Sequence, residues 1–156
     1  MMACMINGGY RIRPHLWRDA PQEKSEKIFS DATLRVVIEG LKKCVEDGPP
    51  APSGTGYAAY IPGMTVVGKT GSAQIMGLEH HEQYKSEEDI PEHMRDHAWF
   101  VAGVIDRAPR LAICILVEYG HHGSSAAAPL AKNIIDFFYN HRAEPSETAD
   151  LLAEGD

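Results

Sequence analysis

Two apolar segments in the second half of the sequence constrain the fold more than any other feature. Residues 98–105 and 111–118 are rich in β-branched and aromatic side chains, and only five residues separate them. A connector this short predicts an antiparallel hairpin, because parallel strands need a crossover of about a dozen residues or more. The β-branched run at residues 64–67 leads into Gly68–Gln74 and predicts a third strand.

Helical patterns flank these strands. Ser30 or Asp31 suits the cap of a helix that ends at Gly48-Pro49-Pro50. Its apolar positions keep the spacing of one helical face: Leu34, Val37, Ile38, Leu41 and Val45. Pro129 suits the first turn of a last helix. That helix carries four apolar residues on one face: Leu130, Ile134, Phe137 and Phe138.

The remaining segments are shorter. Residues 1–6 predict an apolar helix and residues 10–13 a short strand, whereas residues 18–25 are polar and predict a loop. Residues 49–63 are rich in proline and glycine and predict a turn-rich loop, in which we interpret Gly54-Thr55-Gly56 as an ordinary turn. The expected fold class is therefore α+β, with a mostly antiparallel sheet flanked by helices.

Composition limits the classes of protein to which the chain can belong. A chain of 156 residues with 44% hydrophobic residues can bury one ordinary core. Its net charge of −7 arises mainly in residues 79–96 and 142–156, so nucleic acid is excluded as a partner of this surface. We expect residues 142–156 to form a disordered acidic tail.

The opening residues resemble the interior of an apolar helix, with no capping residue and no signal peptide, and no run in the sequence has transmembrane length. We therefore expect the chain to begin partway through a domain. Cys4, Cys44 and Cys114 lie in apolar or helical patterns without C-x-x-C spacing, which indicates buried free thiols.

The stretch Gly68–Gln74 combines one cation, two hydroxyls and two glycines. An ammonium beside hydroxyl donors suits a carboxylate or a phosphate. From Gly63 to Thr70 the sequence also satisfies the phosphate-loop pattern G-x-x-x-x-G-K-[ST]. That loop must curl between a strand and a helix, whereas residues 64–67 favour an extended strand and Gly77 interrupts any helix that follows. The context favours a strand, with nucleotide binding as the alternative.

The segment from Val66 to Gln74 resembles the Lys-Thr-Gly strand of the penicillin-recognising serine enzymes, whose other motifs are Ser-x-x-Lys and Ser-x-Asn. Its Ala-Gln ending is common in penicillin-binding proteins. Residues 77–84 and 95–97 are similar to the insertion of the elongation-type class B enzymes, the penicillin-binding protein 2 group. The resemblance runs from the first residue to about Tyr139. It implies the later half of the transpeptidase fold, with residues 1–141 an incomplete domain that carries a flap at about residues 78–96.

The resemblance also implies roles for four residues. Lys69 is expected to be catalytic at the centre of the site, and the Ser72 backbone N–H to be one of two oxyanion donors. Thr70, Gly71 and Ser72 are expected to bind the terminal carboxylate of a D-Ala-D-Ala stem peptide, or that of a β-lactam. The implied activity is that of a peptidoglycan D,D-transpeptidase, and no cofactor is implied.

Two of the three family motifs are absent. No serine is followed three residues later by lysine, and no Ser-x-Asn occurs. We therefore expect the nucleophile and the general base to lie in an upstream part of the same domain, and this chain alone to be unable to form an acyl-enzyme. The resemblance further implies elongation-complex proteins as partners and a location on the periplasmic side of the bacterial inner membrane. A catalytically silent β-lactam sensor or scaffold of the same fold stays open as an alternative.

Histidines raise the question of a metal. Four lie in or beside the flap: His80, His81, His93 and His97. Without cysteine partners or an H-E-x-x-H pattern, we expect no metal there. Arg95, Asp96 and His97 are expected to order the flap. His121 and His122 occupy a glycine-flanked loop and are candidates for the rim of the substrate site.

Overall fold

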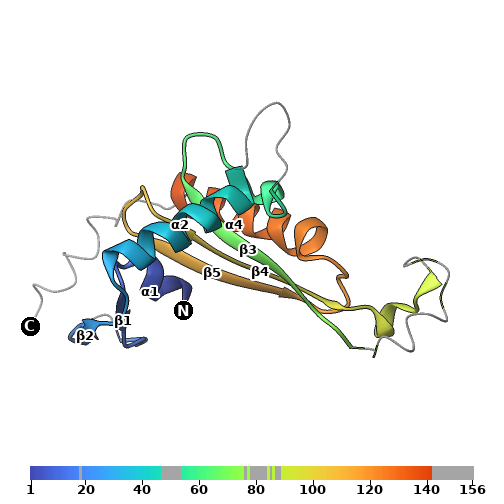
Figure 1. Ribbon diagram of the computed structural model, residues 1–156, viewed down its shortest axis with the longest axis horizontal. Coiled ribbons are helices and arrows are strands. Elements are labelled where there is room, and N and C mark those ends of the chain that lie inside the picture. Colours follow the sequence, from blue (N-terminus) through green and yellow to red (C-terminus); the bar gives the residue numbers. More distant parts are fainter. Residues whose placement is uncertain are drawn as a thin grey trace, which may run out of the picture.

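The computed structural model describes residues 1–17, 19–46, 54–75, 77, 84, 86 and 89–141. Its main elements are α1 (Met2–Ile6), β1 (Tyr10–Ile12), β2 (Lys24–Lys27), α2 (Asp31–Glu46), β3 (Val66–Ala73), β4 (His97–Val104), β5 (Leu111–Val117) and α4 (Ala128–Asn140) (Figure 1). Within the described ranges, three short helical turns accompany them: η1 (Tyr57–Ala59), η3 (Glu92–Met94) and η4 (Gly123–Ala127). The α+β prediction is confirmed.

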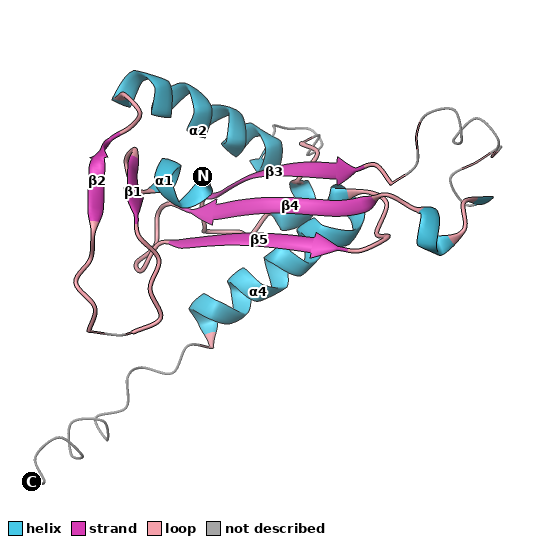
Figure 2. Cartoon of the chain, turned by 90° about the horizontal axis from the view of Figure 1, so that it is seen from below, coloured by secondary structure: helices cyan, strands magenta, loops and turns pink. Residues whose placement is uncertain are grey.

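The centre of the molecule is an antiparallel sheet in the order β3-β4-β5 (Figure 2). Its register places Lys69 opposite Val101 and Thr70 opposite Phe100, and the hairpin between β4 and β5 forms as predicted. Successive side chains of a strand point to opposite faces, so Lys69 and Thr70 lie on different sides of the sheet.

The two faces of the sheet are covered unequally. On the face that carries Val66 and Phe100, the sheet packs against η1, η4 and α4 in the main hydrophobic core. On the opposite face, α1 places Met2 and Ile6 against Val67. The helix α2 runs beside β3 and contributes to both clusters (Figure 2).

The helix α2 begins as the sequence predicts. The Thr33 backbone N–H donates to Ser30 Oγ at 3.1 Å, which satisfies one of the donors that a helix start leaves without a partner. Ser30 is therefore the capping residue, and Asp31 is the first residue of the helix.

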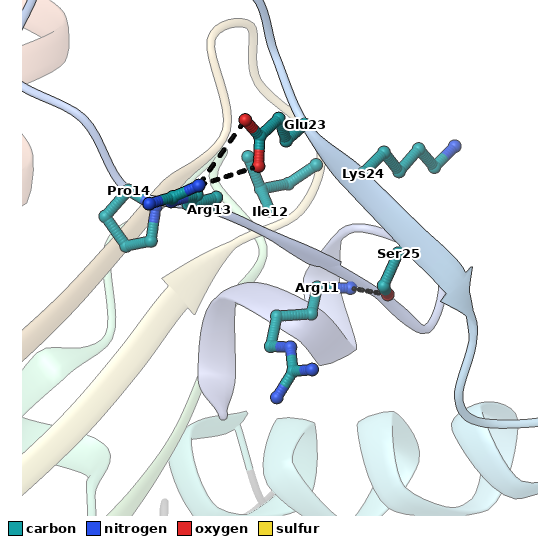
Figure 3. Close-up of a pocket in the computed structure, with 7 residues that line it drawn as sticks. All are labelled: Arg11, Ile12, Arg13, Pro14, Glu23, Lys24 and Ser25. Carbon is teal, nitrogen blue, oxygen red and sulfur yellow. Dashed lines mark hydrogen bonds and ion pairs between the residues drawn. The ribbon is translucent and has the colours of Figure 1, made fainter.

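The prediction of a polar loop over residues 18–25 is wrong for its last two residues, because Lys24 and Ser25 belong to strand β2. This strand has no alternating apolar pattern, and it forms through antiparallel pairing with β1. Side chains reinforce the ribbon: the Arg11 backbone N–H donates to Ser25 Oγ at 3.0 Å, and Arg13 pairs with Glu23 at 3.1 Å (Figure 3).

The last helix does form, but its predicted apolar stripe faces outward. Ala128, Ala131 and Ile135 are fully buried against the sheet. In contrast, three residues of the stripe are 45% to 65% exposed: Leu130, Ile134 and Phe137. The chain between β5 and α4, predicted as a loop, also contains the π-helical turn η4.

Asp106 ties the start of β3 to the turn between β4 and β5. Its Oδ2 accepts the Thr65 backbone N–H at 2.8 Å and lies 3.7 Å from Arg107 Nη1. Burial acts to raise the pKa of this carboxyl, but the hydrogen bonds from Thr65 and the charge of Arg107 outweigh it and hold the pKa below its ordinary value of 3.8.

We expect Asp106→Ala to lower the free energy of unfolding by about 1–2 kcal/mol at pH 7, because it leaves the Thr65 N–H without its acceptor. The depressed pKa means that the carboxylate stabilises the fold above the unfolded-state pKa and loses this effect as pH falls through the folded-state pKa. The difference in stability between the mutant and the wild type should therefore narrow in urea unfolding curves as pH falls through the folded-state pKa, which lies below 3.8. A constant difference at all pH values would contradict this role of the charge.

Within the described part of the chain, no helix combines the length and apolar character needed to cross a membrane. Two further predictions fall largely or wholly outside the described residues. These are the flap, with His80 and His81, and the acidic tail at residues 142–156.

Candidate functional site

The stretch Gly63–Thr70 does not have the geometry of a phosphate loop. Strand β3 covers Val66–Ala73 without interruption, and no described helix follows it directly. Its residues are therefore extended and paired with β4, so successive N–H groups do not converge on one point as a phosphate requires. The nucleotide-binding alternative is excluded by this backbone.

The residues Thr70, Gly71 and Ser72 of β3 line one cavity of about 240 Å³. The other lining residues come from two separate loops: Thr55 from the loop before β3, and His122, Gly123 and Ser124 from the chain after β5. The strand thus supplies two hydroxyls to a small, open, polar cavity. Of the residues singled out in the sequence, His122 joins this group, whereas Thr55 and Ser124 were missed as site residues.

The chain after β5 approaches β3 very closely at Gly123. A Cβ atom added at this position would overlap the Trp99 carbonyl oxygen and would lie 2.9 Å from the Gly71 carbonyl oxygen. Only glycine fits such a backbone approach. Beside it, Ser72 Oγ donates to the His121 carbonyl oxygen at 3.2 Å, and His121 has a positive φ of 62°. The loop is therefore held against the end of the Lys-Thr-Gly sequence.

Asp96 and His97 connect three segments at that end of the sheet. Asp96 Oδ1 accepts the Ile75 backbone N–H at 3.3 Å, and its carbonyl oxygen accepts the His121 N–H at 2.9 Å. His97 Nδ1 accepts the Tyr119 N–H at 3.0 Å, so this ring nitrogen is unprotonated in that contact. Neither side chain lines the cavity at Thr70 and Ser72.

Arg95 does not line that cavity either. Its Nε donates to the Ile90 carbonyl oxygen at 3.0 Å. Of the five residues proposed for the rim or flap, the structure therefore places His122 at the cavity and His121 next to it. It places Arg95, Asp96 and His97 at the base of the flap.

Lys69 lies on the other side of the strand. Its Nζ donates to the Thr70 carbonyl oxygen at 2.9 Å and reaches Thr70 Oγ1 at 3.5 Å. Its side chain lines a separate, mostly apolar cavity of about 580 Å³ between α1 and the sheet, together with Val101 and Cys114. Lys69 is exposed, so its charge is available to a group that approaches this face.

A third cavity, of about 410 Å³, lies at the ribbon of β1 and β2 (Figure 3). The ribbon sits near the start of β3, whereas Thr70 and Ser72 are near the end of that strand (Figure 2). The cavity is lined by exposed charged residues, of which Arg13 and Glu23 already pair with each other. It contributes nothing to the Lys-Thr-Gly site.

Two of the three cysteines deviate from the expectation of buried thiols. Cys4 is buried, Cys44 is half-buried and Cys114 is exposed on β5. Among the described residues, no three or more histidine, cysteine or acidic side chains gather in a group that could hold a metal.

Comparisons with known proteins identify the family of this chain. The family profile described as the penicillin binding protein transpeptidase domain matches residues 1–136. The peptidoglycan D,D-transpeptidase MrdA of Haemophilus influenzae is 34% identical over 146 residues, which are 88% of this chain and 22% of that protein. MrdA of Acinetobacter baumannii is 37% identical, over 86% of this chain and 19% of that protein.

A solved structure has the same fold. In the complex between penicillin-binding protein 2 (PBP2) and MreC from Helicobacter pylori, the matching chain is 25% identical with a TM-score of 0.67. The match covers 88% of this chain and 23% of that one. The chain thus spans about a quarter or less of the proteins just named. It belongs to the penicillin-binding protein transpeptidase domain family and is similar to the MrdA, or penicillin-binding protein 2, members of that family.

Proposed function

We propose that this chain supplies the Lys-Thr-Gly strand of a peptidoglycan D,D-transpeptidase. In that reaction a serine oxygen attacks the penultimate D-Ala carbonyl of a stem peptide, and terminal D-Ala leaves with a proton from the general acid. The resulting ester is then transferred to an amine of a second stem peptide. A β-lactam is attacked in the same way and leaves the serine acylated.

One observation carries this proposal: Thr70 and Ser72 of the edge strand β3 line a single cavity. Two hydroxyl donors near a lysine suit a carboxylate, such as the one that ends a stem peptide. Gly71 between them carries no side chain, so an acyl group has room to lie along the strand. We assign Lys69 as the charge at the centre of the site and the Ser72 N–H as an oxyanion donor.

The nucleophile must come from another part of the polypeptide, since the sequence holds neither Ser-x-x-Lys nor Ser-x-Asn. We propose that an upstream part of the same domain covers the face of the sheet on which Lys69 lies. On this face Trp99 of the central strand β4 is 39% exposed and Leu116 of β5 is 43% exposed, so the face carries uncovered apolar surface.

Two further surfaces support an upstream partner segment. No described strand pairs with the outer edge of β5, whose seven residues include neither a charge nor a proline. Such an edge favours pairing with another strand. The exposed stripe of Leu130, Ile134 and Phe137 on α4 offers an apolar face for a helix.

The place of the reaction in the cell is also a proposal. Because peptidoglycan lies outside the inner membrane, we propose that this domain works on the periplasmic side, with an anchor elsewhere in the polypeptide. The solved complex of a penicillin-binding protein 2 with MreC supports an elongation-complex protein as a partner of this chain as well. We propose that residues 1–141 belong to the transpeptidase domain and that residues 142–156 are a tail.

Covalent labelling by a fluorescent penicillin tests the proposal. The natural polypeptide that contains these residues should gain the mass of one penicillin, whereas the 156-residue chain alone should gain none. Labelling of the chain alone would place a nucleophile within it and refute the division of the site. Failure of both to label would favour a catalytically silent scaffold.

A further inference from the structure

Thr55 occupies a loop that is packed unusually tightly onto the end of α2. The Gly56 N–H donates to the Cys44 carbonyl oxygen at 2.8 Å. A Cβ atom added at Gly54 would lie 2.6 Å from the Lys43 carbonyl oxygen, and one at Gly56 would lie 2.9 Å from the Phe100 ring. Both glycines are therefore required by close approach. The sequence Gly54-Thr55-Gly56, interpreted above as an ordinary turn, fixes the position of one threonine.

That position brings the Thr55 hydroxyl to the Lys-Thr-Gly strand. Thr70 Oγ1 donates to Thr55 Oγ1 at 3.1 Å, and Thr55 Oγ1 lies 3.4 Å from Cys44 Sγ. On the other side, Lys69 Nζ lies 3.5 Å from Thr70 Oγ1. Four side chains thus form one continuous chain of polar contacts: Lys69, Thr70, Thr55 and Cys44.

The number of protons shared among these four polar groups decides whether Thr70 can donate a hydrogen bond to a ligand. A hydroxyl donates one hydrogen bond and accepts two. With Thr70 donating to Thr55, its proton points away from an incoming carboxylate. To bind the carboxylate, Thr70 must rotate its proton into the cavity, and Thr55 must then donate to the Thr70 oxygen. The Cys44 thiol is able to donate to Thr55 in that arrangement, since either atom of the pair can be the donor.

We propose that Thr55 is a positioning residue for the carboxylate subsite, and that it holds the Thr70 hydroxyl in a rotamer from which the proton can turn towards the substrate carboxylate. The inference rests on the proposed function and adds a residue outside the Lys-Thr-Gly sequence to the site. It predicts that the Thr55 hydroxyl matters for ligands with a carboxylate and has little effect on those without one.

The test compares Thr55→Val with Thr55→Ser in the natural polypeptide. Valine keeps the shape of threonine without its hydroxyl, whereas serine keeps the hydroxyl. We expect Thr55→Val to slow acylation by benzylpenicillin by about tenfold, because one hydrogen bond to the subsite is lost. Acylation by the methyl ester of benzylpenicillin should keep its wild-type rate. Thr55→Ser should acylate within about twofold of the wild type, which a role in packing alone would not predict.

The control is Thr33→Val, which makes the same chemical change at the opposite end of α2. The melting temperature of each variant reports any loss of folding. An unchanged ratio of acid to ester rates in Thr55→Val would overturn the inference, as would a serine variant as slow as the valine variant.

If the wild-type polypeptide forms no adduct with benzylpenicillin, the proposed function is refuted, and the inference about Thr55 is then decided separately. Ligand-observed NMR then decides the role of Thr55, with an acetylated D-Ala-D-Ala peptide as free acid and as carboxamide. A preference for the acid that disappears in Thr55→Val and returns in Thr55→Ser supports the inference. The same acid preference in all three proteins, or no preference in the wild type, refutes it.

Discussion

Replacing Lys69 by alanine should slow acylation of the natural polypeptide by β-lactams by about 10²–10³-fold, the usual loss when one fixed group that stabilises developing charge is removed. The Lys69 ammonium is held at 2.9 Å from the Thr70 carbonyl oxygen and is exposed on the face where we place the nucleophile. The second-order rate constant for labelling by a fluorescent penicillin measures the effect.

Two variants separate the role of Lys69 from a general loss of positive charge. Lys132→Ala removes an exposed lysine from α4 and should leave the rate unchanged. Lys69→Arg keeps the charge, but guanidinium geometry differs from that of an ammonium, so its rate should lie between those of the wild type and Lys69→Ala. Because Lys69 is exposed, the melting temperature should change little. Equal acylation rates for Lys69→Ala and the wild type would refute the role assigned to this residue.

Gly123→Ala should have the second large effect, on the fold and the site together. The new methyl group would overlap the Trp99 carbonyl oxygen and press on Gly71. Overpacking of this kind costs about 1–3 kcal/mol, and we expect a loss of about 2–3 kcal/mol because backbone atoms cannot rotate away. Urea unfolding measures this loss. Displacement of η4 from β3 would also move the wall of the cavity that holds Thr70 and Ser72, so acylation should fall by about 10²-fold.

Gly40→Ala is the matched control for this substitution. Gly40 lies inside α2, and apart from the adjoining residues and backbone of that helix no atom lies within 4 Å of a Cβ added there. Alanine should therefore stabilise the protein by about 1 kcal/mol through helix propensity, and acylation should not change. If Gly123→Ala were as stable as Gly40→Ala, that result would contradict the close approach described between η4 and β3.

Strong local patterns made most of the fold predictable from the sequence. The hairpin of β4 and β5 follows from two apolar segments with a short connector, and the start of α2 follows from Ser30 as a cap. Residues 64–67 favour an extended strand by local preference, and this preference correctly outweighed a letter-for-letter match to a phosphate loop.

The mispredicted features depend on contacts between separate segments of the chain. The strand β2 has the sequence Lys-Ser-Glu-Lys, so only its pairing with β1 makes it a strand. On α4, periodicity identifies an apolar stripe, but it does not say which face meets the sheet. Small residues, Ala128 and Ala131, allow close packing on that side and leave Phe137 exposed.

The site was predictable along the strand and, through His122, in part of the loop after β5. Thr70, Gly71 and Ser72 line one cavity because they are neighbours in β3. Thr55 precedes Thr70 by 15 residues and had no signal except its two flanking glycines, whose meaning depends on contacts with α2. A glycine needed for close approach looks the same in a sequence as one in an ordinary turn.

The structure of a β-lactam acyl-enzyme of the natural polypeptide would show directly whether the Lys-Thr-Gly strand of this chain and a serine from elsewhere form one site. We expect the acyl ester on a serine outside the 156 residues, next to Lys69. We also expect the ligand carboxylate within hydrogen-bond distance, about 3 Å, of Thr70 Oγ1 and Ser72 Oγ. A ligand carboxylate bound elsewhere, with these two hydroxyls still directed at Thr55 and His121, would contradict this expectation.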